Sequence, residues 1–255
     1  IISKNVNNDI STFYLDNNSN KVDYIPLGVD YEKFNSLASR EDMKSKAKEL
    51  RDNISSENII LGVDRLDYTK GIPQRLRAFE LFLEENPKFR GDVTLVQRIP
   101  PSRISADEYQ SILRRINRII GEINGKYEET KWTPIKSFHR FLPDQEQLIP
   151  YYMAADVALV TPLVDGMNLV SKEWIASADD GVLILSEFAG AAEDLTEAIE
   201  VNPHNTRQVA QSIKRALTMP EEERKRRLNR LKERVKNKDL DWWRGEFIKR
   251  WTDVY

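Results

Sequence analysis

The most informative segment of the sequence is Val157-Ala-Leu-Val-Thr-Pro-Leu-Val-Asp-Gly-Met-Asn-Leu-Val-Ser-Lys-Glu173, because it passes from strand to turn to helix. The apolar run up to Val160 predicts a strand, and Pro162, which has no N–H, ends it. Asp165-Gly166 predicts a turn, and Asn168 is a suitable helix N-cap. In an open parallel sheet, such a junction places helix N–H groups at the carboxyl ends of the strands, where anionic ligands bind.

Glu173 is the unusual residue of the predicted helix. It follows Leu169 by four positions and Val170 by three, so its carboxylate shares a helix face with apolar side chains. A carboxylate in that position needs a partner. The residues leave two interpretations open: a ligand site, or an ordinary capped helix in which Asp165 is a turn residue and Glu173 bonds a neighbouring amide.

Strand and helix patterns alternate over most of the remaining chain. We expect strands at Lys21–Val29, Asn58–Leu66, Asp92–Ile99, Ile135–Phe141, Ala158–Val160, Val182–Ser186 and Ala198–Val201. We expect helices at Lys44–Asn53, from Pro73 onward, at Tyr109–Ile123, at Gln145–Ala154, after Asn168, at Gly190–Asp194 and from Thr206 onward. This order predicts an α/β fold: a doubly wound, mainly parallel, Rossmann-like sheet with helices on both faces.

The two ends of the chain differ from this pattern. Residues 1–20 are rich in asparagine and predict a loosely packed entry segment. The final helix carries an aromatic stripe made of Trp242, Trp243, Phe247, Ile248 and Trp251. Such a stripe needs cover, either from the flank of its own domain or from a second body, and the sequence leaves both possibilities open.

Composition excludes several functional classes. The 255 residues carry a net charge of −2 with the two signs well mixed, which gives no reason to expect nucleic acid. The chain has no cysteine and two histidines, so disulfides and cysteine-ligated metals are excluded and a histidine metal site is disfavoured. We find neither an apolar run of transmembrane length nor a secretory signal pattern, and the composition fits a reducing cytoplasm.

Three predicted loops at strand carboxyl ends hold polar residues that could meet in one crevice. Arg65 and Lys70 bracket the first, Arg103 lies in the second, and Asp165 with Glu173 belongs to the third. Two fixed cations beside helix N-termini suit a diphosphate, and a buried carboxylate suits ribose hydroxyls. Taken singly, Arg65 and Lys70 also fit surface charges or partners of Asp64 and Asp67. Neither GxGxxG nor GxxxxGK[ST] follows any predicted strand.

Several segments together resemble the trehalose-6-phosphate synthase family. They are Gly62-Val-Asp-Arg-Leu-Asp-Tyr-Thr-Lys-Gly71, Pro101-Ser-Arg103, Asn124-Gly-Lys-Tyr127, Thr161 to Glu173, and Ser186-Glu-Phe-Ala-Gly-Ala-Ala192, in the family's order. The resemblance runs from about Val22 to the last helix and covers the C-terminal half of such an enzyme. It implies a GT-B fold and transfer of glucose from UDP-glucose to glucose 6-phosphate, with retention and without a metal or other cofactor.

The resemblance also implies roles for particular residues. Arg65 and Lys70 would hold the donor diphosphate and stabilise the departing UDP, and Arg103 would approach the acceptor phosphate. No enzyme nucleophile is required, because the leaving phosphate accepts the acceptor's proton during same-face attack. The other implied donor contacts are Asp165 and the backbone of Gly166, Met167 and Asn168 for glucose, the amides of Leu169 and Val170 for phosphates, Glu173 for ribose, and a segment near Phe141 for uracil.

The resemblance further divides the chain. Residues 1–30 would be the tail of an N-terminal domain and a linker, 31–239 the nucleotide-sugar domain, and 240–255 a helix that packs towards that N-terminal domain. Most acceptor contacts belong to the N-terminal domain, so we expect the chain to bind nucleotide sugar weakly and not to turn over alone. The sequence leaves open whether the protein forms a homo-oligomer.

Other functions remain as alternatives. A sister glycosyltransferase could use ADP- or GDP-glucose, or another phosphorylated acceptor such as glycerol 3-phosphate, because Arg103 suits any phosphate. A catalytically silent nucleotide-binding or regulatory module is a second alternative. An oxidoreductase of the Rossmann type would need a glycine-rich turn that the sequence lacks.

Overall fold

A six-stranded parallel sheet forms the centre of the molecule. The computed structural model describes residues 4–7, 10–15, 18–100, 106–140 and 144–252. The strand order is β6-β5-β4-β7-β8-β9, and every neighbouring pair runs parallel. The strands are β4 (Asn58–Val63), β5 (Val93–Arg98), β6 (Ile135–Phe138), β7 (Val157–Val160), β8 (Val182–Ser186) and β9 (Ile199–Val201).

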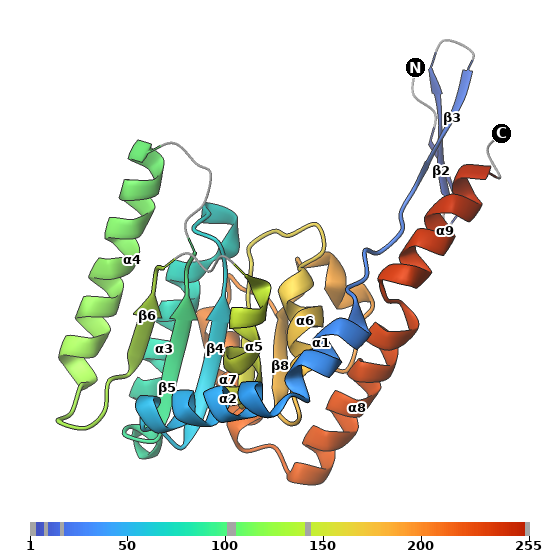
Figure 1. The fold of residues 1–255 in the computed structure, drawn as a ribbon. Coiled ribbons are helices and arrows are strands. Elements are labelled where there is room, and N and C mark those ends of the chain that lie inside the picture. Colours follow the sequence, from blue (N-terminus) through green and yellow to red (C-terminus); the bar gives the residue numbers. More distant parts are fainter. Residues whose placement is uncertain (1–3, 8–9, 16–17, 101–105, 141–143, 253–255) are drawn as a thin grey trace.

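Helices cover both faces of this sheet, which confirms the doubly wound α/β prediction (Figure 1). One core contains residues of α1 (Tyr31–Ala38), α2 (Glu41–Ile54), α5 (Ile149–Ala154), α6 (Leu169–Ser177) and α8 (Glu221–Asn237). The other core contains residues of α3 (Ile72–Glu85), α4 (Ala106–Tyr127) and α7 (Thr206–Leu217). Strands buried on both faces are apolar throughout, which explains the unbroken Ile59-Ile-Leu run of β4.

The strand order reverses between β4 and β7. From β4 the chain proceeds outward through β5 to β6, then returns across the sheet to β7 on the other side of β4. β4 and β7 pair through Ile60 with Val157 and Leu61 with Ala158. Their following loops therefore diverge onto opposite faces and leave a crevice at the carboxyl ends, which is where open parallel sheets bind ligands.

The N-terminal segment differs from the prediction. In place of an irregular entry followed by a strand over Lys21–Val29, β1 (Lys4–Asn7), β2 (Ile10–Leu15) and β3 (Asn18–Asp23) form a small antiparallel sheet. Asparagine is depleted in strands, and this composition hid the pattern. Residues 24–30 are outside any strand because Pro26 cannot donate and the carbonyls of Leu27 and Val29 bond Lys172 and the amide of Leu240.

The last helix, α9 (Leu240–Thr252), extends away from the sheet (Figure 1). Its rings form a ladder: Trp243 and Phe247 stack with centroids 5.4 Å apart, and Phe247 and Trp251 follow at 6.2 Å. None of its residues is buried, so the described part of this domain leaves the aromatic stripe largely exposed. Arg250 donates to the carbonyl of Tyr24 at 3.2 Å, which places the end of the helix beside the N-terminal linker.

Smaller corrections concern how elements end. The strands predicted to reach Leu66 and residue 141 end at Val63 and Phe138. The helix predicted over Gly190–Asp194 is a single 3-10 turn, η4 (Gly190–Glu193), and the helix predicted from Gln145 begins as the 3-10 turn η3 (Gln145–Leu148) before α5. Boundary residues are where local sequence signals are weakest.

Candidate functional site

A cavity of about 390 Å³ lies at the carboxyl ends of β4 and β7, the position that the strand order favours. It collects most of the predicted site residues, although they come from loops about a hundred positions apart. The cavity is lined by Leu27, Val63, Asp64, Arg65, Lys70, Asp165, Met167, Asn168, Leu169 and Val170. The two loops therefore form one site.

An ion pair joins the two loops across the cavity. Lys70 Nζ lies 2.7 Å from Asp165 Oδ2, and both side chains are mostly buried, with 14% and 16% exposed. The same carboxylate oxygen accepts a bond from Asn168 Nδ2 at 3.1 Å. The alternative in which Lys70 pairs with Asp67 is not observed, since Asp67 accepts bonds from the amide and hydroxyl of Thr69.

The loop after β4 holds its charges in a defined turn. Asp67 caps the 3-10 turn η1 (Tyr68–Lys70), and Gly71 follows with φ of 63° before α3 begins. Burial raises the pKa of the Asp67 carboxyl, but the two bonds from Thr69 and the charges of Lys70 and Arg65 outweigh burial and lower that pKa overall. Arg65 is exposed on the cavity wall, so its charge is available to a ligand.

The loop after β7 ends at a capped helix, as predicted. Asn168 Oδ1 accepts the amide of Ser171 at 3.0 Å, and Asn168 has a left-handed φ of 77°. The loop after β8 braces this turn: the amide of Gly190 donates to the carbonyl of Asp165 at 3.0 Å, and the amide of Ala191 to that of Met167 at 2.8 Å. The positive end of α6 thus faces the cavity through Leu169 and Val170.

Beneath the cavity, Arg75 of α3 forms a fully buried ion pair with Asp64. Its guanidinium also donates to Thr161 Oγ1 at 3.0 Å and to Gln97 Oε1 at 3.1 Å. One cation thereby ties together the carboxyl ends of β4, β5 and β7. A buried charge is stable only when it is paired, so Arg75 keeps the Asp64 carboxylate at the cavity floor. Arg65 and Lys70, which also line the cavity, are not partners of Asp64.

Glu173 lies one helical turn beyond the cavity wall. Only 6% of the residue is exposed, and its Oε2 accepts a hydrogen bond from the hydroxyl of Tyr152 at 2.7 Å. Burial raises the pKa of Glu173, and the bond from Tyr152 and the charge of Lys33 partly oppose that rise. The predicted burial of this carboxylate is confirmed, and its partner is a tyrosine hydroxyl, not a neighbouring amide.

Two predicted residues of the described part of the chain, Gly166 and Glu173, are not in the cavity lining. Gly166 belongs to the same turn but is exposed, and Glu173 is behind the wall. Arg103 and Phe141 lie outside the described residues, so the predictions for them stay predictions.

Sequence reasoning missed three contributors. Asp64 was weighed as a partner of Arg65, and its position directly after an apolar strand could have marked it as part of the rim. No feature of the sequence marks Leu27 as a cavity residue, because the segment Lys21–Val29 was predicted to be a strand. No feature of the sequence marks Tyr152 either, because its hydrogen bond to Glu173 joins two separate helices, α5 and α6.

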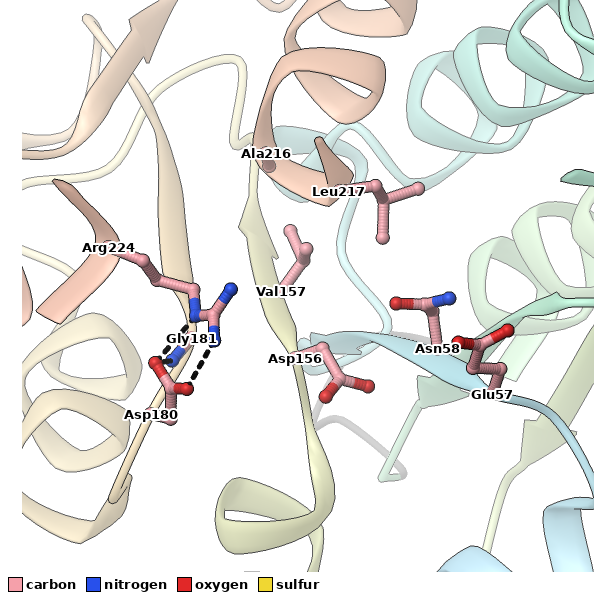
Figure 2. Close-up of a pocket in the computed structure, with 9 residues that line it drawn as sticks. All are labelled: Glu57, Asn58, Asp156, Val157, Asp180, Gly181, Ala216, Leu217 and Arg224. Atoms are coloured by element: carbon pink, nitrogen blue, oxygen red, sulfur yellow. Dashed lines mark hydrogen bonds and ion pairs between the residues drawn. The ribbon is translucent and has the colours of Figure 1, made fainter. Parts of the chain in front are cut away.

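A second cavity of about 210 Å³ opens at the amino ends of the strands, on the opposite rim (Figure 2). None of the predicted site residues lines it. Three of its charged side chains are already paired: Arg224 donates twice to Asp180, each bond 2.6 Å, and Asp156 accepts from Arg51 and from the amide of Ile59. These bonds join α8 to the residues before β8, and join α2 and β4 to the residue before β7, which gives the polar groups of this cavity a structural explanation.

The described residues contain no group of three or more histidine, aspartate or glutamate side chains that could hold a metal ion. Among the same residues, no helix is both long enough and apolar enough to cross a membrane.

The fold and the position of the cavity define the class: a Rossmann-like α/β domain with a cavity at the switch point of its sheet. Residues 1–253 match the model of glycosyltransferase family 20, and the chain belongs to that family. Its fold is that of the corresponding part of GT-B glycosyltransferases.

Similar proteins are trehalose-phosphate synthases. The alpha,alpha-trehalose-phosphate synthase (UDP-forming) of Candida albicans is 43% identical over 226 residues, which are 88% of this chain and 47% of that protein. The structure of the Burkholderia xenovorans enzyme in complex with glucose-6-phosphate has a TM-score of 0.91 and 34% identity over 98% of this chain and 56% of its own. An E. coli structure bound with UDP-2-fluoro glucose has a TM-score of 0.89, 34% identity, and 98% and 55% coverage. This chain therefore spans about half the length of these relatives.

Proposed function

We propose that this chain is the donor-binding half of a retaining, metal-independent glucosyltransferase that transfers glucose from UDP-glucose to glucose 6-phosphate, forming trehalose 6-phosphate and UDP. The observation that carries the proposal is the meeting of Lys70, Asp165 and the N-terminus of α6 around one cavity. Membership of glycosyltransferase family 20 and the ligands of the related structures support it.

The charges of the cavity suit a diphosphate. Arg65 offers a bidentate guanidinium and Lys70 a point charge, and the helix N-terminus beside Leu169 and Val170 offers free amides. These groups favour negative charge most when the diphosphate leaves, so they stabilise the transition state more than the ground state. This supply of positive charge is what a divalent metal provides elsewhere.

Asp165, the acidic partner of Lys70, is suited to bind the hydroxyl groups of the donor glucose. Asp165 accepts from Lys70 and Asn168 in the absence of ligand, and sugar hydroxyls can replace those donors. Once Lys70 turns to the diphosphate, the Asp165 oxygen becomes available to glucose. We assign the ribose hydroxyls to Glu173, one turn further along α6, and Arg103 and the segment near Phe141 keep the acceptor-phosphate and uracil roles that the resemblance implies.

The reaction balances without a residue that acts as nucleophile. The bond from glucose C1 to the β-phosphate oxygen breaks, and C1 bonds the anomeric oxygen of glucose 6-phosphate on the same face. The proton of that hydroxyl passes to the departing phosphate oxygen. Arg65 and Lys70 hold the charge that develops on the leaving UDP.

The proposal includes a partner for the exposed aromatic stripe of α9. An N-terminal Rossmann-like domain would close over the cavity, supply most acceptor contacts and cover the Trp243–Phe247–Trp251 ladder. Exposed apolar surface of this kind usually marks an interface. Residues 1–30 would be the tail of that domain and the linker, and a cytoplasmic location fits the absence of cysteine from this chain.

Calorimetric titration of the chain with UDP tests the donor site. In the structure Lys70 is not the exposed lysine that its loop position suggested, so we choose Lys70→Met, which keeps the packing of the side chain. We expect UDP affinity to fall ~10-fold or more, because a charge-assisted contact to phosphate is lost. Lys44→Ala, an exposed lysine of α2, is the control. Equal UDP affinity of wild type and Lys70→Met would refute the role of Lys70.

A panel of nucleotide sugars separates the sister-enzyme alternative. UDP-, ADP- and GDP-glucose share the diphosphate and the glucose, so Arg65, Lys70 and Asp165 contact the same groups in all three. Tighter binding of ADP- or GDP-glucose than of UDP-glucose would assign another donor. A silent binding module would bind UDP but stay inactive when the N-terminal half is supplied.

A further inference from the structure

Tyr152 and Glu173 form a hydrogen-bonded polar pair inside a mainly apolar core. Tyr152 belongs to α5 and is fully buried, and its hydroxyl lies 2.7 Å from Glu173 Oε2 on α6. The apolar neighbours in this core include Trp174 and Ile175 of the same helix. A buried carboxylate in such surroundings is unfavourable without a donor, and Tyr152 is the donor that the structure provides.

The chemistry of the pair fixes which partner donates. Burial and the negative charge of Glu173 both raise the pKa of Tyr152 well above its ordinary value, so the phenol keeps its proton. The hydrogen bond in turn favours the ionised form of Glu173 against the burial that disfavours it. The Oε2 atom of Glu173 therefore accepts the hydrogen bond from Tyr152, and this bond also fixes the orientation of Oε1.

This fixed orientation matters because of where Glu173 sits. Leu169 and Val170 line the cavity, and Glu173 is on the same helix face one turn further along. Its main chain is held as well, since its carbonyl accepts the hydroxyl of Ser177 at 2.8 Å. A hydrogen bond to a ligand hydroxyl is strong only when the acceptor is held in place before the ligand arrives.

We propose that Tyr152 is a positioning residue for the donor site: its hydroxyl holds the Glu173 carboxylate in the orientation that receives the ribose hydroxyls of the nucleotide. The inference rests on the proposed function, in which Glu173 meets the ribose. Tyr152 itself does not touch the nucleotide. It acts through Glu173, so its removal affects the ribose contact and leaves the diphosphate contacts of Arg65 and Lys70 unchanged.

A tyrosine with a purely structural role would behave differently. Its loss would weaken every ligand of the domain alike, through looser packing between α5 and α6. The discriminating measurement is therefore the ratio of affinities for two ligands that differ only in the ribose hydroxyls. UDP and 2′,3′-dideoxy-UDP form such a pair, and inorganic pyrophosphate reports on the diphosphate contacts alone.

The experiment compares the wild-type chain with Tyr152→Phe by calorimetry. We expect wild type to prefer UDP over the dideoxy ligand, and Tyr152→Phe to lose ~5- to 10-fold of that preference, which corresponds to about 1.0 to 1.4 kcal/mol. Pyrophosphate affinity should be the same in both. Tyr127→Phe, which removes the hydroxyl of a buried tyrosine on α4, is the matched control and should keep the full preference.

Three results would overturn the inference. An unchanged preference in Tyr152→Phe shows that the hydroxyl does not position Glu173. Equal weakening of UDP, dideoxy-UDP and pyrophosphate shows a structural role. Absence of any ribose preference in wild type removes the contact on which Tyr152 acts. Failure of the proposed function looks different, because wild type would then bind neither UDP nor pyrophosphate.

Discussion

The Glu173 carboxyl is buried, and burial disfavours its ionised form and so raises its pKa. A carboxyl whose pKa is raised in the folded state contributes stability that is fully present below its ordinary pKa and is lost as the pH rises through the raised value. At neutral pH the ionised side chain therefore destabilises the fold. Selection for a ligand contact is a reason to keep such a residue, since functional sites often reduce stability.

Glu173→Gln should therefore stabilise the folded chain at neutral pH while it weakens the binding of UDP. The amide oxygen can still accept the bond from Tyr152, and no charge has to be buried. The gain should be largest at pH 7 to 8 and shrink as the pH falls through the raised pKa of the wild-type carboxyl, where that group becomes protonated. Urea unfolding over this pH range measures it. A variant that is less stable than wild type at every pH would contradict the account.

At the scale of the element, the start of α6 depends on Asn168. Its left-handed φ of 77° is unfavourable for most side chains, and its Oδ1 accepts the amide of Ser171. The residue also donates to Asp165, so one side chain starts the helix and shapes the cavity.

Two substitutions separate the contributions of Asn168. Asn168→Gly loses the cap but accepts the positive φ, whereas Asn168→Ala loses the cap and strains the backbone. We expect the glycine variant to lose about 0.3 kcal/mol of unfolding free energy and the alanine variant about 1 kcal/mol more. Thermal or urea unfolding checks both. If the alanine variant equals or exceeds the glycine variant in stability, the backbone conformation of Asn168 is not a determinant of the turn.

The sequence was most informative about the helices and strands. The alternation of apolar strands with amphipathic helices predicted the parallel sheet, and Pro162 with Asn168 predicted the junction after β7, because these signals are local. The sheet of residues 4–23 was not predicted, since its asparagine content masks strand propensity.

Contacts between distant residues were the other part that sequence could not supply. The Lys70–Asp165 pair was expected only in outline, from loops at strand ends, and its partners were not identified. The Arg75–Asp64 pair and the Tyr152–Glu173 bond were not predicted, because nothing in the spacing of these residues marks them as neighbours. Such pairings arise from the packing of helices on the sheet and appear only in three dimensions.

For the whole molecule, we expect nucleotide binding and turnover to separate. The described domain contains the proposed diphosphate contacts, and the chain spans about half the length of its relatives. We propose that most acceptor contacts come from the N-terminal half of such an enzyme. We expect no trehalose 6-phosphate from UDP-glucose and glucose 6-phosphate with this chain alone. Adding a separately expressed N-terminal half of a family member should give activity.

The assay is the formation of UDP and trehalose 6-phosphate, with Lys70→Met plus the N-terminal half as the control. Substantial turnover by the chain alone would show that the division between the two halves is wrong. Lack of turnover in the mixture, combined with tight UDP binding by the chain, would favour the silent binding module.

The most direct measurement is a map of backbone amide chemical shifts with and without UDP. We expect changes at residues 64–71 and 163–173, on the carboxyl rim, and none at Asp156, Asp180 or Arg224 on the opposite rim. Changes confined to the opposite rim, or no changes at either loop at saturating UDP, would contradict the claim that this rim binds the nucleotide.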